Sequence, residues 1–177
     1  MSDPDHNGHR QTGFHCATCG KRHDHLPMEF GADAPAFYNS IPKVERESRC
    51  ELNEDLCVID DEFFFIRGCL DLPVIDHDEP FVWGVWVSLS KDSIKRCYEI
   101  RDQEGRESES PFFGWLSTTL PLYPETLNLK THVHTRPIGT KPFIELEPTD
   151  HPLAVEQREG ITMDRVREIA ARLLHSD

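Results

Sequence analysis

The chain has 177 residues, of which 32 are acidic and 19 are basic, so its formal net charge at pH 7 is −13. A surface with this charge repels phosphate backbones and anionic lipid head groups, which argues against general nucleic-acid binding and against docking on an anionic membrane. The length favours one domain with its own core, for which ten Phe, three Trp and three Tyr supply large side chains.

The sequence shows no targeting or membrane-spanning segment. No apolar run approaches the roughly 20 residues that a transmembrane helix needs, and the first ten residues lack the apolar core of a signal peptide. We therefore expect a cytoplasmic protein. In that reducing compartment, the six cysteines are expected to be thiols or metal ligands rather than a disulfide framework.

The N-terminal part contains the strongest chemical signal. Residues 1–13 are polar and predict a disordered tail. Residues 14–25 contain Cys16-x-x-Cys19-Gly20, which predicts a zinc-knuckle-like turn. Two thiolates at this spacing fold around a tetrahedral Zn²⁺, and the glycine permits a tight approach of backbone to sulfur. A redox motif of the thioredoxin type is not favoured, because it would lie between a strand and a helix of a βαβ unit.

A closed structural zinc site needs four ligands, and the sequence has no second C-x-x-C. We favour His23 and Cys57 as the other two, which gives a site of Cys16, Cys19, His23 and Cys57 that joins the knuckle to the centre of the chain. The other candidates are His25, Cys50, Cys69 and His151. In the alternative interpretation, Cys57 and Cys69 are small apolar residues of a sheet, as buried cysteines commonly are.

The centre of the predicted sheet is a β-hairpin over residues 56–68. Two apolar runs rich in Val, Ile and Phe flank Asp60-Asp61-Glu62, a pattern typical of two strands joined by a turn. Because both runs are nearly continuous in apolar residues, we expect both strands to be covered on two faces. The three carboxylates are interpreted as a solvated turn rather than an acid–base site.

Further strands and helices follow from hydrophobic periodicity and capping residues. The predicted strands are 70–75, where Pro73 indicates an edge, 81–89, 112–116, 126–136 and 141–147. The predicted helices are 42–47, 91–101 with Ser90 as its N-cap, and 163–174 with Thr162 as its N-cap. These elements indicate an α+β class. We predict one domain over residues 14–177, in which helices pack on one side of a mainly antiparallel sheet of five or six strands, with the knuckle at its edge.

Two histidine patterns are weaker signals. Asp150 and His151 lie between Pro148 and Pro152, and an adjacent carboxylate can orient an imidazole for catalysis or metal binding. No nucleophile elbow, phosphate loop or His-Glu-x-x-His accompanies them, so the favoured interpretation is a histidine that caps a turn. His132 and His134 share one face of a strand with basic residues, which favours a solvated face.

Four stretches carry a resemblance to a known family: a head at residues 16–23 that begins with C-x-x-C-G, residues 55–59 together with 65–68, Trp83-Gly84-Val85-Trp86-Val87, and a T-D-H-P-L-A-V-E tail at 149–156. Together they resemble an uncharacterised bacterial family classed as a domain of unknown function. The resemblance implies a small bacterial protein of one domain. It implies no activity, substrate or ligand set.

The function favoured by the sequence is non-enzymatic, with a structural zinc ion and an acidic surface that binds a protein partner. A metal-dependent hydrolase that uses Asp150 and His151 is the alternative, and it would need an open metal site with three protein ligands and water. A third hypothesis is a small-ligand pocket lined by Trp83, Trp86 or Trp115.

Overall fold

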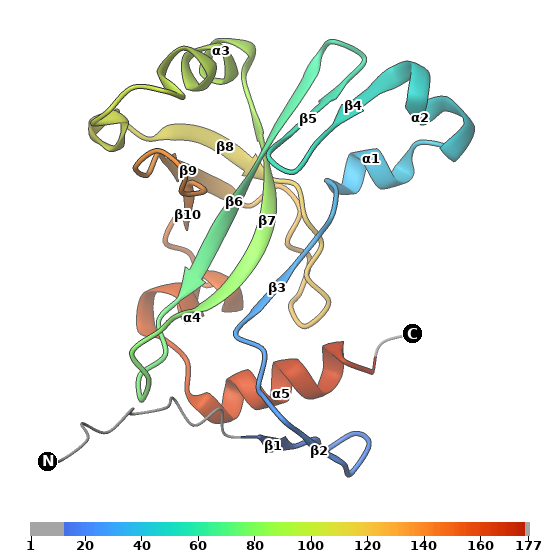
Figure 1. Ribbon diagram of the computed structural model, residues 1–177, viewed down its shortest axis with the longest axis vertical. Helices are drawn as coiled ribbons and strands as arrows, with labels where there is room; N and C mark the ends of the chain where they lie inside the picture. The colour runs from blue at the N-terminus through green and yellow to red at the C-terminus, as the bar shows by residue number, and fades with distance from the viewer. Residues whose placement is uncertain (1–12, 176–177) are drawn as a thin grey trace, which may run out of the picture.

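The computed structural model describes residues 13–175 (Figure 1). The predicted tail therefore lies outside the described residues, apart from Gly13. The strands are β1 (Phe14–His15), β2 (Arg22–His23), β3 (Glu29–Gly31), β4 (Cys50–Leu52), β5 (Leu56–Ile59), β6 (Phe63–Leu72), β7 (Phe81–Leu89), β8 (Phe112–Leu116), β9 (Lys130–His134) and β10 (Phe143–Leu146). The helices are α1 (Ala36–Ser40), α2 (Lys43–Arg49), α3 (Lys91–Ile100), α4 (Pro152–Glu159) and α5 (Met163–Leu173), with a 3-10 turn at Arg106–Ser108.

Five of these strands close into a barrel, in the order β6–β7–β8–β9–β10. The four pairings that link them in this order are antiparallel, and a fifth pairing, a parallel contact of Phe143 with Cys69, returns β10 to β6. There the Cys69 amide donates to the Pro142 carbonyl at 2.8 Å. The hairpin β4–β5 extends the sheet beyond β6, and β3 pairs in parallel with β7. The predicted sheet with helices on one side is therefore wrong.

A glycine lets the barrel close. Gly68 lies on β6 directly beneath β10, and a Cβ atom at this position would be only 2.6 Å from Cδ1 of Ile144. Any larger residue would hold β10 away from β6, as expected where a strand glycine marks a close approach. The sheet thus curves back on itself instead of presenting one face to helices.

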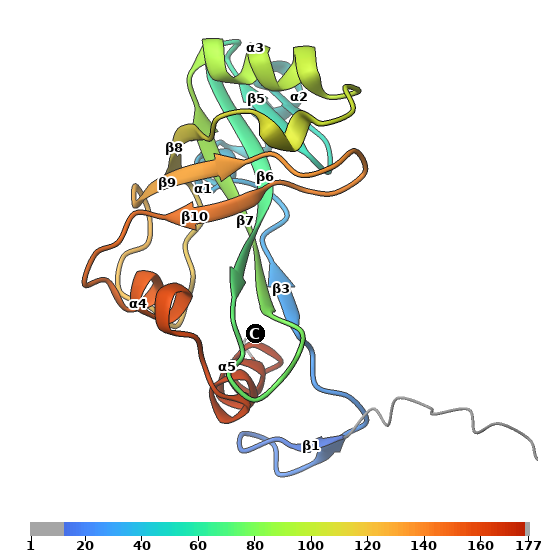
Figure 2. The same ribbon diagram turned by 90° about the vertical axis from the view of Figure 1, so that its left-hand side faces the viewer.

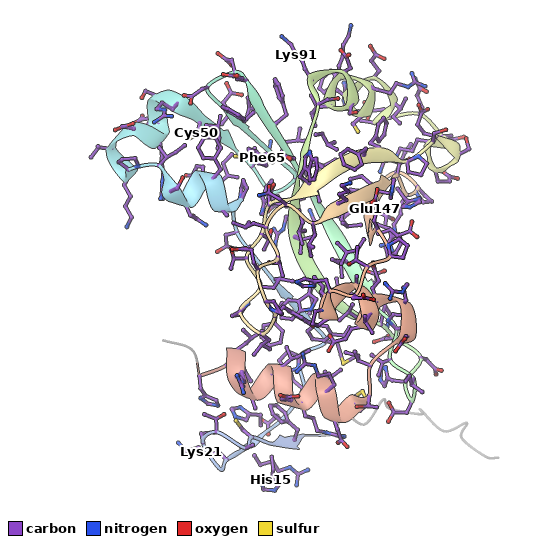
Figure 3. All side chains as sticks on the ribbon, turned by 180° about the vertical axis from the view of Figure 1, so that it is seen from behind. His15, Lys21, Cys50, Phe65, Lys91 and Glu147 are labelled. Carbon is purple, nitrogen blue, oxygen red and sulfur yellow. The ribbon has the colours of Figure 1, made fainter. Side chains whose placement is uncertain are left out.

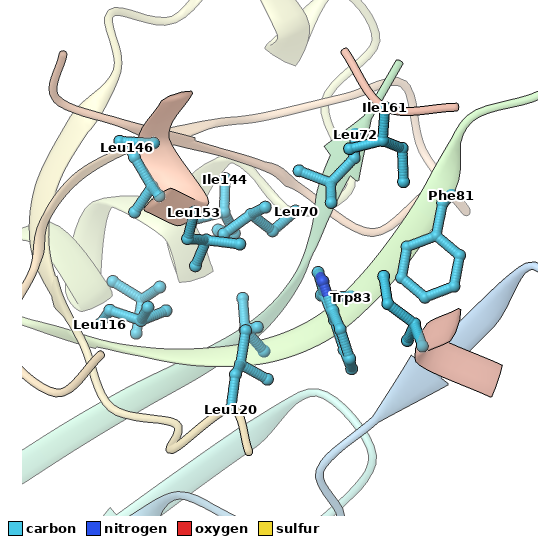
Figure 4. Packing of buried hydrophobic residues seen from close by; sticks show 14 of the residues in the cluster. Leu70, Leu72, Phe81, Trp83, Leu116, Leu120, Ile144, Leu146, Leu153 and Ile161 are labelled. Atoms are coloured by element: carbon cyan, nitrogen blue, oxygen red, sulfur yellow. The ribbon is translucent and has the colours of Figure 1, made fainter. Parts of the chain in front are cut away.

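Helices α4 and α5 lie at one end of the barrel and α3 at the other, while α1 and α2 lie beside the β4–β5 hairpin (Figures 1 and 2). At one end, α4 and α5 bury Leu153, Val166 and Ile169 against the inward-facing residues of the barrel. Figure 4 shows part of this core, in which the labelled residues are Leu70, Leu72, Phe81, Trp83, Leu116, Leu120, Ile144, Leu146, Leu153 and Ile161. At the other end lies α3, of which only Ile100 is buried.

The predicted hairpin is confirmed as β5 and β6. Its turn holds Asp60 and Asp61 at φ values of 53° each, a region that Asp tolerates better than most residues. Burial alternates along β5, where Cys57 and Ile59 are buried and Val58 is half-buried. The expectation of cover on both faces is therefore wrong for this strand.

The N-caps predicted for two helices, Ser90 and Thr162, are confirmed. The Ser90 side chain accepts a hydrogen bond from the Ser93 amide at the start of α3, and Thr162 accepts one from the Arg165 amide at the start of α5. The predicted strand 126–136 is shorter, since β9 covers only Lys130–His134. Helix α4 was not predicted, because the prolines before and within its first turn suggested two turns. Among the described residues, no helix combines the length and apolar character required to span a membrane.

Candidate metal centre

Four side chains from the two ends of the described chain meet beside α5. The ligand atoms of Cys16, Cys19, His23 and His175 all lie within 4.8 Å of one another. The first three come from the β1–β2 segment, on which Figure 3 labels His15 and Lys21, and the fourth follows the last turn of α5. This is the one group of such ligands with metal-binding spacing among the described residues.

The knuckle turn places the two thiols together. β1 and β2 pair antiparallel, with Phe14 opposite His23. Between them, Gly20 has a φ of 67°, which favours glycine over any residue with a Cβ. The Gly20 amide donates to the Cys16 carbonyl at 2.9 Å, so the chain reverses tightly around the Cys16-x-x-Cys19 loop. The Cys19 Sγ then lies 3.5 Å from Nε2 of His23.

Helix α5 supplies the fourth side chain because its small residues pack on the knuckle. Phe14 and Cys16 form a small core with Ala170 and Ala171. The Thr18 hydroxyl donates at 3.0 Å to the carbonyl of Ala171, one of the carbonyls at the helix end that lack a partner within the helix. His175 follows Ala171 by four positions and thus lies on the same side of the chain. Its Nε2 is 3.0 Å from the Cys16 Sγ.

The donor set and its spacing fit a tetrahedral zinc ion. Zinc–sulfur and zinc–nitrogen bonds of standard length place S and N ligands about 3.6 Å apart in a tetrahedron. The two S···N separations in the structure are 3.0 and 3.5 Å, and no two ligand atoms of the group are more than 4.8 Å apart. Only small shifts of these side chains are required to reach the tetrahedral geometry. Two thiolates beside the negative end of the α5 dipole also favour a divalent cation at this position.

The thiols of the chain differ in their acidity. Burial raises the pKa of Cys16, but hydrogen bonds from the Cys19 and Thr18 backbone and from the Cys19 and His175 side chains outweigh this and lower it to about 6. Burial raises the pKa of Cys57 to about 12 and that of Cys97 to about 11. Cys16 therefore favours the thiolate form that binds metals, whereas the Cys57 and Cys97 thiols remain protonated at neutral pH.

The structure does not bring Cys57 to this group. Cys57 is fully buried on β5, in a second core cluster with Ile41, Ile59, Phe65 and Trp86. It occupies the place of a small apolar residue, which was the alternative interpretation. His25, also a candidate, is exposed and lies outside the group. None of the six cysteines, all within the described residues, forms a disulfide.

His175 was missed by the sequence reasoning. No spacing motif links it to the knuckle, from which it is 159 residues distant. The available signal was indirect: the apolar stripe of the last helix ends with Leu173 and Leu174, directly before His175. That stripe would have placed the histidine only if the packing of α5 on the knuckle had been known.

Asp150 and His151 form no such centre. The His151 Nδ1 accepts a hydrogen bond from the Leu153 amide at 3.2 Å and so caps α4. Its Nε2 is buried and has no hydrogen-bond partner in the described part of the chain, and Asp150 is exposed. His151 thus stabilises a helix start, in agreement with the turn-capping interpretation.

Within the described residues, the remaining histidine and tryptophan candidates from the sequence do not form a metal or ligand site either. The His134 Nε2 lies 2.6 Å from a carboxylate oxygen of Glu145, and the His132 Nε2 lies 3.3 Å from one of Glu147. Trp83 and Trp86 are buried in two different core clusters, and only Trp115 is exposed. The three tryptophans therefore do not line one pocket.

Comparison with known proteins identifies a family and no function. Residues 15–161 match the family model described as "Uncharacterized protein conserved in bacteria (DUF2199)", in agreement with the resemblance found in the sequence. Cys16, Cys19 and His23 lie within the matched range, and His175 lies beyond it. No curated protein and no solved structure matches the chain.

Proposed function

The chain belongs to the family of uncharacterised proteins conserved in bacteria (DUF2199), and we propose that it binds one structural zinc ion through Cys16, Cys19, His23 and His175. The observation that supports this proposal is the approach of four ligand atoms of the right types to within 4.8 Å. Four protein ligands leave no open position for water or substrate, which favours a structural role over a hydrolytic one.

The zinc ion would hold the N-terminal knuckle on the C-terminal helix. The knuckle has strands of only two residues, β1 and β2, and its buried side chains are those of Phe14 and Cys16. Such a segment buries too little apolar surface to be stable by itself. Zinc binding would supply the missing free energy, since a metal that binds only the folded state stabilises that state.

Cobalt substitution tests the ligand set directly. We expect Co²⁺ added to metal-free protein to give one equivalent of a tetrahedral spectrum with thiolate charge-transfer bands. The His175→Gln variant should lose the tetrahedral spectrum or bind Co²⁺ at least tenfold more weakly, because removal of one ligand opens the site. His25→Gln is the matched control, since His25 lies in the same segment outside the group. Equal spectra and affinities for His175→Gln and the wild type would refute the four-ligand site.

We further propose that the protein acts through a protein partner. Phe63, Phe113 and Trp115 are 41 to 43% exposed and surround a hollow of about 400 Å³ beside Ser90 and Ser93. The rings of Phe113 and Trp115 pack edge to face, with centroids 5.1 Å apart. Exposed aromatic clusters are typical of protein interfaces. The net charge of −13 would favour a basic partner.

Chemical crosslinking tests this surface. A Trp115→Ala/Phe113→Ala variant should lose the crosslinks that the wild type forms with one specific protein in bacterial extract. Ile75→Ala removes an exposed apolar side chain elsewhere, 71% exposed, and should leave those crosslinks unchanged. Partner crosslinks that persist in the double variant would exclude this patch as the interface.

A further inference from the structure

A groove of about 760 Å³ lies between α3, the β5–β6 hairpin and the loop that connects β9 to β10. It is at the end of the molecule opposite the candidate zinc site, as the positions of α3 and β1 in Figures 1 and 2 show. Lys91 at the start of α3 and Lys21 on the knuckle mark these two ends in Figure 3. The volume falls in the range of small-molecule sites.

Apolar side chains cover the floor and two walls of the groove. Leu56, Val58, Phe64 and Ile66 come from the hairpin, Ile94 from α3, and Ile138 from the β9–β10 loop. The hairpin residues and Ile94 are only half-buried, and Ile138 is 50% exposed. The described chain therefore leaves this apolar surface without full cover, and a ligand with an apolar body would remove it from water.

The groove differs in charge from the rest of the protein. Its lining contains six cations, which are Arg67, Lys95, Arg101, Arg106, Arg136 and Lys141. It contains three carboxylates, those of Glu54, Asp55 and Asp102. Arg136 is paired with Asp71 and Lys141 with Asp55, so the local excess of positive charge comes from the other four cations, in a chain whose net charge is −13. A cleft of one sign concentrates ligands of the opposite sign.

One of these cations fixes the wall of the groove. The Arg106 guanidinium donates to the carbonyls of Arg101, Arg136, Pro137 and Thr140, at distances between 2.6 and 3.2 Å. These bonds hold the end of α3 and the β9–β10 loop in one arrangement. The groove is therefore preformed, and a ligand would not have to order its walls on binding.

Two cations remain available at the rim, Lys95 on α3 and Arg101 at the C-cap of this helix. Lys95 is exposed and forms no hydrogen bond or ion pair in the described part of the chain. Arg101 stacks over the Tyr98 ring at 3.8 Å, and its only carboxylate contact there is with the exposed Asp102 at 3.1 Å. An exposed pair of this kind is weak and exchanges readily for another anion.

We propose that this groove binds a small amphipathic anion, an aliphatic chain with one carboxylate or phosphate head group. The aliphatic chain lies on the hairpin side chains, and the head group lies at the rim near Lys95 and Arg101. The proposal concerns a second site and does not depend on the zinc ion.

Calorimetric titration with a series of matched ligands tests the chemistry. Octanoate should bind the full-length protein at one saturable site, and octyl phosphate separates a preference for phosphate from one for carboxylate. Octyltrimethylammonium has the same chain and the opposite charge, so we expect it to bind at least tenfold more weakly. No saturable binding of either anion, or equal affinity for the cation, would overturn the proposal.

Variants locate the site. Lys95→Glu and Ile138→Asp should each weaken the binding of the preferred anion roughly 5- to 10-fold, by charge reversal and by loss of apolar contact. Both positions are exposed, so far-UV circular dichroism should show an unchanged fold. Lys91→Glu is the control, because Lys91 is an exposed lysine of the same helix outside the groove. Wild-type affinity in both groove variants would show that the anion binds elsewhere and would refute this site.

Discussion

Cys16 and His175 lie 159 residues apart in the sequence, yet the Sγ of one is 3.0 Å from the Nε2 of the other. This contact joins the two ends of the described chain outside the barrel. Among the described residues, the knuckle and α5 also share a small apolar cluster and a hydrogen bond from the Thr18 hydroxyl to the Ala171 carbonyl. The proposed zinc ion would thus determine whether the two ends stay together.

Metal removal should loosen both ends and leave the barrel intact. In metal-free protein we expect faster amide hydrogen exchange in residues 14–25 and in the last turn of α5, because the ligands come from these segments. Amides of β7, which is paired on both sides in the barrel, serve as the internal control. Uniform loss of protection across the barrel would contradict a peripheral role for the metal.

Substitution of Gly68 should destabilise the closure of the barrel. The added Cβ of Gly68→Ala would meet the Ile144 side chain at 2.6 Å, so we expect a loss of about 1–3 kcal/mol in the free energy of unfolding by urea.

A double-mutant cycle identifies the cause. Ile144→Ala removes the atoms that the new Cβ meets, so Gly68→Ala/Ile144→Ala should lose less stability than the sum of the single variants. Strict additivity would show that Gly68 acts through something other than its contact with Ile144.

Tyr123 should make stability depend on pH in alkaline solution. Its hydroxyl donates to Glu156 at 2.5 Å, and burial together with this carboxylate raises the pKa of Tyr123 above its ordinary value. The unfolded chain releases this proton near pH 10. The contribution to stability is therefore fully present below about pH 10 and is lost as the pH rises toward the higher pKa of the folded state.

Comparison with Tyr123→Phe isolates this effect. At pH 8 the variant should be less stable by about 1 kcal/mol, because the Glu156 oxygen loses its donor. At pH 10.5 the difference between variant and wild type should be smaller. A difference that stays constant or grows with pH would contradict the assignment.

The sequence predicted those features that depend on neighbouring residues. The hairpin of β5 and β6, the N-caps Ser90 and Thr162, and the Cys16-x-x-Cys19 turn each follow from a short stretch of chain. The closure of the barrel does not, because it depends on one parallel contact between Phe143 and Cys69 from distant segments. An isolated glycine such as Gly68 does not reveal which strand will approach it.

The fourth ligand could not be predicted for a similar reason. Cys57 was favoured because it was expected to reach the knuckle without distant chain movement, but the hairpin that carries it is directed toward the end of the molecule opposite the knuckle (Figure 1). The position of His175 depends on the packing of Ala170 and Ala171 against Phe14 and Cys16. Such a contact between small residues leaves no periodic signal beyond that of an ordinary amphipathic helix.

The most direct test of the central claim is the metal content of protein purified without a histidine tag, measured by mass spectrometry for the wild type, His175→Gln and Cys57→Ser. We predict one equivalent of zinc in the wild type and in Cys57→Ser, and a substantial loss of zinc in His175→Gln. Wild-type protein without zinc, or a His175→Gln variant that retains a full equivalent while Cys57→Ser loses it, would contradict the site described above.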